Sequence, residues 1–283
     1  MDGPRIITQT LSQPDNVTDS YGNNWQYHSR SDRHSKAACW AFLFDLLRHC
    51  ALLRKHVTQG LVGFGINHKM IDFSQNKKKD LDLVICRTDP KESTSTRSFL
   101  TLADEFRIAL TAEQRRMLSE FPLLRIAPVG NVLIAVEAKA AMTSHIKACP
   151  QLYDELNSSH SIIHGDSQVA IAVGLVLINY AERFISPDSN KFGLAGHDAK
   201  VSLHKQPHAT ERTIATITQL DRRSSTNSPG FDGVAALVID CGNDGRPVTL
   251  VTAPPAPSKD HVLNYDALVN RIDHLYRSRF PQA

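Results

Sequence analysis

Two segments of this sequence place charged side chains inside apolar runs. The first, KKKDLDLVI, carries Asp80 and Asp82, and the second, VLIAVEAKA, carries Glu137 and Lys139. A carboxylate or an ammonium group inside a buried strand is costly unless it has a partner. These residues are therefore the first candidates for a functional site.

The alternation of side chains along a strand predicts which of these groups face the same way. Positions 80, 82 and 84 share one face of the first segment, and positions 81, 83 and 85 share the other. In the second segment Glu137 and Lys139 share a face.

A divalent cation would compensate the buried charge. Asp82 and Glu137 offer hard oxygen ligands, and the backbone carbonyl of Ala138 offers a third. Mg²⁺ suits such a site because it takes few protein ligands and keeps several waters. Lys139 would lie beside a metal-bound water, where it would orient that water, lower its pKa or stabilise charge on a phosphate.

This arrangement resembles a known family. An Asp that opens an apolar strand, an ExK motif in a second buried strand, a helix and a further apolar strand are similar to the PD-(D/E)xK restriction-endonuclease-like superfamily over about residues 36–181. In this match Asp82 is the "D", Glu137 the "D/E" and Lys139 the "K". The resemblance implies hydrolysis of phosphodiester bonds, usually in DNA, with Mg²⁺ as cofactor, Mn²⁺ as a substitute and a 5′-phosphate as product.

The expected function is therefore a Mg²⁺-dependent endonuclease that acts on double-stranded DNA, in the context of restriction or phage defence by analogy with the family. Cutting both strands requires two sites, which favours a homodimer or a higher homo-oligomer. If the site cuts DNA, three lysines that enter the strand of Asp82 are expected to meet phosphates, although a solvated loop is the commoner fate of such a run. They are Lys77, Lys78 and Lys79.

The pattern also departs from the family. The [DE]xK pattern occurs three times, at 89–91, 137–139 and 198–200, and only the second copy lies in a buried strand. No proline precedes the acid, and Asp80 competes with Asp82. Two alternatives stay open: a non-catalytic binding or assembly module with a nuclease-like fold, and an RNA-cleaving enzyme with the same metal site.

Other residues have weaker claims to chemistry. His160 and His164, like His145 and Cys149, have the i,i+4 spacing of zinc ligands on a helix, but no third ligand is evident. Asp154 and Glu155, on the helix after ExK, are candidates for supporting contacts, although a solvated face is more common.

Composition sets the wider frame. The chain has 283 residues, of which 41% are hydrophobic and 22% charged, with a formal net charge of +3. These values are typical of a soluble globular protein. The five cysteines form no CxxC, and the longest apolar run, 169–181, is too short to cross a bilayer. We expect a cytoplasmic protein with no membrane partner.

Periodicity predicts an α/β (α+β) fold with a central mixed β-sheet flanked by helices. Helices are expected at 36–58, 100–121, from 143 or 150 to 161, 211–223 and 261–279. Strands are expected at 61–73, 81–86, 131–141 and 169–181, with a hairpin of 234–239 and 248–252. The predicted regions are a polar N-terminal arm (1–35), a nuclease-like core (36–185), a loop or insertion (186–230) and a C-terminal hairpin and helix packed on the same core (231–283).

Overall fold

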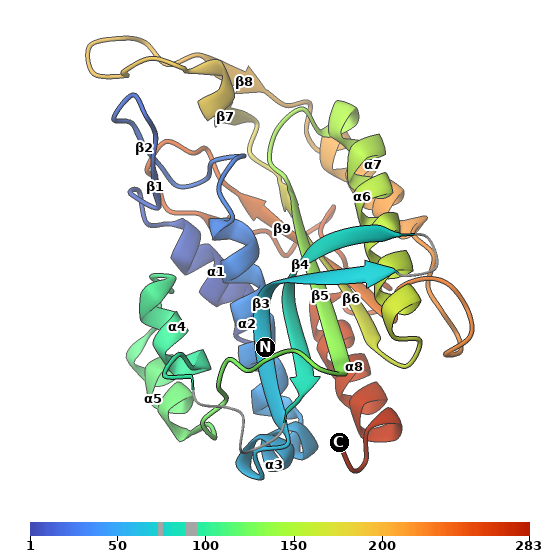
Figure 1. Cartoon of the computed structure of the whole chain (residues 1–283). Helices are drawn as coiled ribbons and strands as arrows, with labels where there is room; N and C mark the ends of the chain where they lie inside the picture. The colour runs from blue at the N-terminus through green and yellow to red at the C-terminus, as the bar shows by residue number, and fades with distance from the viewer. Residues whose placement is uncertain (73–75, 89–94) are drawn as a thin grey trace.

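A central mixed sheet organises the chain in the computed structural model, which describes residues 1–72, 76–88 and 95–283. Six strands run in the order β10-β9-β6-β5-β4-β3 (Figure 1). Strands β5, β6 and β9 are parallel, and the outer pairings are antiparallel. The strands are β3 (Val62–Asp72), β4 (Lys77–Arg87), β5 (Val132–Ala141), β6 (Ile171–Asn179), β9 (Gly233–Asp240) and β10 (Thr249–Leu250).

Helices cover both faces of this sheet. Helices α1, α2 and α8 contribute to the larger core, and α6 and α7 pack on the opposite face (Figure 1). The helices are α1 (Gly3–Leu11), α2 (Arg33–His49), α3 (Ala51–Thr58), α4 (Phe99–Glu105), α5 (Ala112–Glu120), α6 (His145–Asp166), α7 (His208–Thr218) and α8 (Tyr265–Arg279). The smaller elements are the pair β1 (Val17–Thr18) and β2 (Asn24–Trp25), the pair β7 (Arg183–Ile185) and β8 (Val201–Leu203), and η1 (Pro187–Ser189).

The predicted mixed sheet flanked by helices is confirmed. The apolar run of 169–181 contains β6, whose nine residues are all buried between two parallel neighbours. The C-terminal hairpin adds β9 beside β6 and β10 at the edge, so residues 231–283 contribute to the same sheet. No helix in the described part of the chain is long and apolar enough to span a membrane.

The helices differ from the sequence prediction at two places. The segment 36–58 forms two helices because Cys50 adopts an extended conformation and its Sγ accepts the N–H of Leu53. The segment 100–121 is also divided, with Arg107 in the left-handed region between α4 and α5. Helix α6 begins at His145 after the N-cap Ser144, so the earlier of the two expected starts is confirmed, and Pro150 lies inside the helix.

The region expected to be a polar arm holds part of the core. Ile6, Ile7 and Leu11 of α1 are buried, and α1 packs on α2. The carboxylate of Asp45 in α2 accepts the N–H groups of Asp2 and Gly3, which satisfies free donors at the start of α1. The region expected to be a loop at 186–210 likewise contains η1, β8 and the start of α7.

Strand β4 changes its surroundings part-way along its length. It pairs with β5 only from Leu83 to Cys86, while its other half continues with β3 towards α6 (Figure 1). Leu83 packs in the core on the α2 side, but Leu81 packs with Val84 on the α6 side. The predicted alternation over positions 80–85 therefore breaks at Asp82, because β4 leaves β5 at this point.

Candidate active site

The predicted acids lie where β4 and β5 separate. Leu83 and Val136 form the last register pair between these strands, so Asp82 and Glu137 occupy the next position on each. Beyond the last pair, Oδ2 of Asp82 accepts the N–H of Ala138 at 2.8 Å. The side chain of Asp82 thus replaces a backbone acceptor that the departing strand no longer supplies.

The backbone of Ala138 faces this gap. In an antiparallel ladder, the N–H and C=O of one residue point to the same neighbouring strand. Because the Ala138 N–H is directed towards Asp82, its carbonyl is also directed to the side that β4 has left. The predicted third oxygen ligand therefore faces the same opening as Asp82.

Glu137 is buried and has two different oxygen environments. Its side chain is 2% exposed. Its Oε1 lies 2.9 Å from Nζ of Lys139 and 3.3 Å from Nζ of Lys79. Its Oε2 is also buried but has no hydrogen-bond partner among the described residues. One oxygen is thus anchored, and the other is available to a ligand.

Helix α6 supplies a third carboxylate. Oε2 of Glu155 lies 3.1 Å from Nζ of Lys139, and Nζ of Lys79 donates to the Glu155 carbonyl at 2.7 Å. Burial alone would lower the pKa of Lys139, but the charges of Glu137 and Glu155 raise it. Lys139 therefore stays an ammonium group at neutral pH, and the expected supporting contact of Glu155 is present.

Asp82 is the perturbed acid of this cluster. Burial, and then the charge of Glu137, raise its pKa to about 6, against the opposing effects of the Ala138 N–H and the Ser35 hydroxyl. Burial, followed by the charges of Asp82 and Glu137, also raises the pKa of Cys39 well above its usual value. The first turns of α2 thus form one wall of the cluster.

His34, at the start of α2, is a further member that the sequence did not indicate. Burial and then the charge of Lys139 lower its pKa to about 4, so the ring is neutral at pH 7. Its Nδ1 is buried without a hydrogen-bond partner in the described residues. Its ring packs on Tyr27, with centroids 5.1 Å apart.

The cluster carries an excess of negative charge. Counted as ionised, Asp82, Glu137 and Glu155 contribute three negative charges, which Lys79 and Lys139 only partly offset. Within the described residues, no group of three or more His, Cys, Asp or Glu side chains is placed to hold a metal. A site of two carboxylates completed by a carbonyl and waters fits Mg²⁺, because this ion is commonly held by one or two protein carboxylates.

The competing sequence candidates lie elsewhere. Asp80 is exposed and is in register with Lys69, whereas Asp82 is the acid that lies near Glu137. Lys77 and Lys78 are exposed, whereas Lys79 is committed to Glu137 and Glu155. The [DE]xK copy at 198–200 lies in the irregular segment just before β8, and the copy at 89–91 lies outside the described residues.

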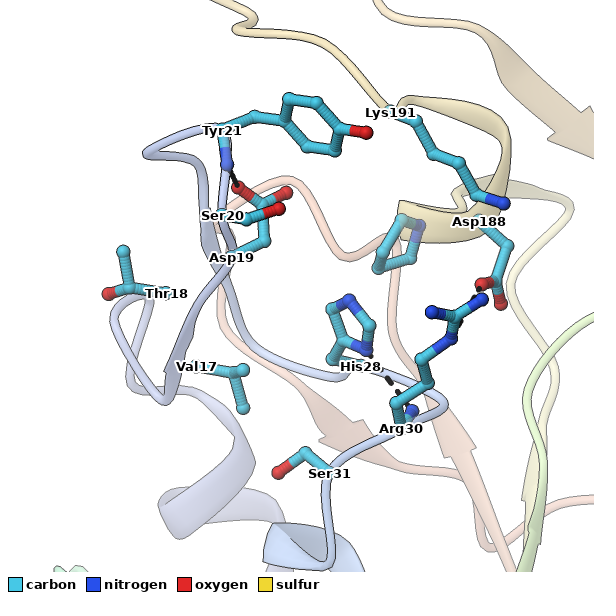
Figure 2. Close-up of a pocket in the computed structure, with 11 residues that line it drawn as sticks. Val17, Thr18, Asp19, Ser20, Tyr21, His28, Arg30, Ser31, Asp188 and Lys191 are labelled. Carbon is cyan, nitrogen blue, oxygen red and sulfur yellow. Dashed lines mark hydrogen bonds and ion pairs between the residues drawn. The ribbon is translucent and has the colours of Figure 1, made fainter.

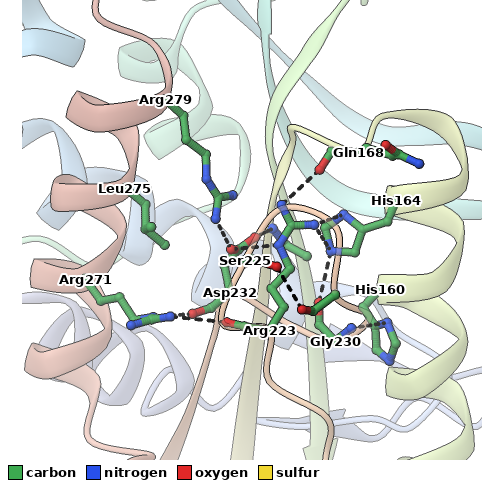
Figure 3. A network of polar contacts seen from close by, with 12 residues as sticks. His160, His164, Gln168, Arg223, Ser225, Gly230, Asp232, Arg271, Leu275 and Arg279 are labelled. Atoms are coloured by element: carbon green, nitrogen blue, oxygen red, sulfur yellow. Dashed lines mark hydrogen bonds and ion pairs between the residues drawn. The ribbon is translucent and has the colours of Figure 1, made fainter.

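The two helical histidines have partners other than a metal. Nε2 of His160 lies 2.7 Å from Oδ1 of Asn157, and Nε2 of His164 lies 3.0 Å from the Gly230 carbonyl. Figure 3 shows His164 beside Arg223, whose Nη1 is 2.7 Å from its Nδ1. A guanidinium group at this distance opposes the binding of a cation, so His164 is a poor zinc ligand.

The other helical pair is also engaged by the protein. Nε2 of His145 lies 2.8 Å from the Asn179 carbonyl, and Cys149 is hydrogen-bonded to the Thr213 hydroxyl. Neither group is directed at a shared cation.

A buried ion-pair network, which the sequence did not indicate, holds the strand ends near α8. The side chains of Arg223 and Asp232 are both fully buried and 3.1 Å apart, and Arg279 contacts the same carboxylate oxygen (Figure 3). The other oxygen of Asp232 accepts the N–H of Ala172 at 2.9 Å. This network joins α8 to the starts of β6 and β9, and its role is structural.

Comparison of the chain with protein-family models, with curated proteins and with solved structures finds no match.

Proposed function

We propose that this protein is a Mg²⁺-dependent endonuclease that hydrolyses phosphodiester bonds of DNA on a restriction-endonuclease-like core. The observation that carries the proposal is the cluster at the separation of β4 and β5, where Asp82 and Glu137 adjoin Lys139. The unpartnered Oε2 of Glu137 and the raised pKa of Asp82 both favour a cation between the two acids.

Each residue then has a defined task. Asp82 and Glu137 would hold the cation with the help of the Ala138 carbonyl, and Mg²⁺ would supply Lewis acidity there. Lys139 orients the attacking water and stabilises charge on the phosphate. Because its pKa is raised, Lys139 acts as a cation rather than as a general base.

The remaining members of the cluster position Lys139. Oε1 of Glu137 and Oε2 of Glu155 contact its ammonium group from two elements, which restricts the side chain to one direction. The neutral ring of His34 adds no charge near the phosphate position. The proposed substrate is double-stranded DNA, in restriction or phage defence, and cleavage of both strands requires a homodimer or a higher homo-oligomer.

A second candidate function is a binding or assembly module without catalysis. One observation favours it: Oε1 of Glu137 already has two lysine partners, so part of the buried charge is compensated by the chain itself. An RNA-cleaving enzyme with the same cation site is the other candidate, because the cluster does not distinguish the two sugars.

Incubation of purified protein with supercoiled plasmid and with structured RNA, in Mg²⁺ or in EDTA, separates these functions. The proposal expects Mg²⁺-dependent plasmid cleavage that Glu137→Gln abolishes. Glu120→Gln, an exposed acid of α5, is the matched control and should cleave like the wild type. Cleavage of RNA alone would support the RNA enzyme, and cleavage of neither substrate in Mg²⁺ or Mn²⁺ would support the binding module.

A further inference from the structure

A second cavity lies away from the carboxylate cluster. Its volume is about 480 Å³, and its walls come from the β1–β2 hairpin, the segment before α2 and the region of η1. Figure 2 shows Tyr21, His28, Arg30 and Lys191 around this space. Its volume lies within the range of small-molecule sites.

One wall is built by Asp19. Its carboxylate accepts the backbone N–H of Tyr21 at 2.8 Å and the indole N–H of Trp25 at 2.8 Å. It also accepts the backbone and amide N–H groups of Asn23, whose amide in turn donates to the Phe192 carbonyl. This wall is therefore fastened to the segment around Phe192, and Asp19 has little capacity left for a ligand.

The second carboxylate of the cavity is engaged in the same way. Oδ2 of Asp188 accepts the Ser29 hydroxyl at 2.6 Å, and Oδ1 lies 3.9 Å from Nε of Arg30. Asp19 is thus engaged by protein donors through both oxygens, whereas Asp188 is hydrogen-bonded through Oδ2 and faces Arg30 with Oδ1.

Donors for a ligand remain. Nδ1 of His28 accepts the N–H of Arg30 at 3.1 Å, which leaves Nε2 as the ring nitrogen that can face a ligand. Lys191 has no ion-pair partner among the described residues. The side chain of Arg30 reaches Asp188 with one nitrogen only, which leaves other guanidinium donors. These groups favour an anionic ligand.

The aromatic side chain narrows the class of ligand. Tyr21 is 49% exposed, and Figure 2 shows its ring at the rim, on the same side of the cavity as Lys191. A half-exposed ring that lines the same cavity as a cation can stack on a flat heterocycle while the cation holds a phosphate.

We propose that this cavity binds a nucleotide, with its phosphate held by Lys191 and Arg30 and its base against Tyr21. The same chemistry is presented by a free mononucleotide and by the phosphorylated end of a nucleic-acid strand. The proposal stands on the cavity and is independent of cleavage at Glu137.

Calorimetric titration of the full chain tests the proposal. The probes are AMP, adenosine, inorganic phosphate and a 5′-phosphorylated tetranucleotide. We expect AMP or the tetranucleotide to bind at least about tenfold more tightly than adenosine or phosphate, since adenosine lacks the charge-assisted contact and phosphate lacks the stacked base, and each is worth about that much. Binding of AMP as tightly as of the tetranucleotide assigns the free nucleotide, and preference for the tetranucleotide assigns the strand end.

Variants complete the test. Lys191→Ala and Tyr21→Ala should each weaken binding about tenfold, while Lys259→Ala, an exposed lysine outside the cavity, should bind like the wild type. The bonds from Asp19 involve only the backbone of Tyr21, so its side chain can be removed without breaking the wall. Equal affinity for phosphate and AMP, no binding of any probe, or full binding by both cavity variants would overturn the proposal.

Discussion

Replacing Asp82 by Asn should stabilise the folded protein while abolishing cleavage. Burial and Glu137 raise the pKa of Asp82 from 3.8 to about 6. One pKa unit corresponds to about 1.4 kcal/mol, so the ionised carboxylate lowers the free energy of unfolding by about 3 kcal/mol at neutral pH. Asn has the same shape, and its Oδ1 can still accept the Ala138 N–H.

The pH dependence follows from the raised pKa. Below pH 3.8 Asp82 is protonated in both the folded and the unfolded chain, so its titration does not change the free energy of unfolding. Between pH 3.8 and about 6 the unfolded chain ionises first, and stability falls as the pH rises. The free energy of unfolding of Asp82→Asn should therefore exceed that of the wild type by about 1.5 kcal/mol at pH 5 and by about 3 kcal/mol at pH 7.5.

Urea unfolding at these two pH values, without divalent cations, measures this difference in the free energy of unfolding. In thermal unfolding at pH 7.5, the melting temperature of the variant should be about 6–12 °C higher for a chain of this size. Asp80→Asn is the matched control, because this neighbour is exposed, and it should change stability little. If Asp82→Asn were no more stable than the wild type at pH 7.5, the Asp82 carboxylate would not be buried beside Glu137 as the structure has it.

Three further predictions test the fold. Asp232→Ala should lower the free energy of unfolding by about 3–5 kcal/mol in urea, because two arginines lose their buried partner. The control is Arg246→Ala, which breaks the exposed ion pair with Asp244 and should lower the free energy of unfolding by less than about 1 kcal/mol. An equal loss in both variants would contradict the stabilising role of the buried pairs of Asp232. Gly3→Ala should cost about 1–3 kcal/mol in thermal unfolding, since its Cβ would lie 2.1 Å from Oη of Tyr265; an unchanged melting temperature would refute this contact. The five cysteines are free and buried, so a thiol reagent should label none of them before unfolding, and rapid labelling of the native protein would show an opening that the structure lacks.

The strands of the sheet could be predicted because their apolar pattern is visible in a short stretch of sequence. β5 and β6 appear in the sequence as continuous apolar runs, which is the pattern of strands covered on both faces. The ends of the helices were less predictable, because the apolar periodicity of α2 continues past Cys50 into α3. Helix α1 packs on α2, and its start is held by Asp45, which is distant in sequence, so local composition suggested an arm instead.

The candidate site was only partly predictable, because some of its contacts depend on tertiary structure. Asp82, Glu137 and Lys139 could be proposed from their apolar neighbours. The engagement of Lys79 depends on the path of β3 and β4 towards α6, which is a tertiary feature. His34 reaches the cluster only because the first turn of α2 lies near the end of β5, and no local signal marks it.

The most direct test of the cation site is single-turnover cleavage of an end-labelled DNA duplex, with Mg²⁺-induced thermal stabilisation measured on the same samples. We expect the wild type to cleave only with Mg²⁺ and to leave 5′-phosphate ends. Glu137→Gln should lose both cleavage and stabilisation by Mg²⁺, whereas Lys139→Met should lose cleavage but keep the stabilisation. Cleavage by Glu137→Gln at the wild-type rate would contradict the central claim.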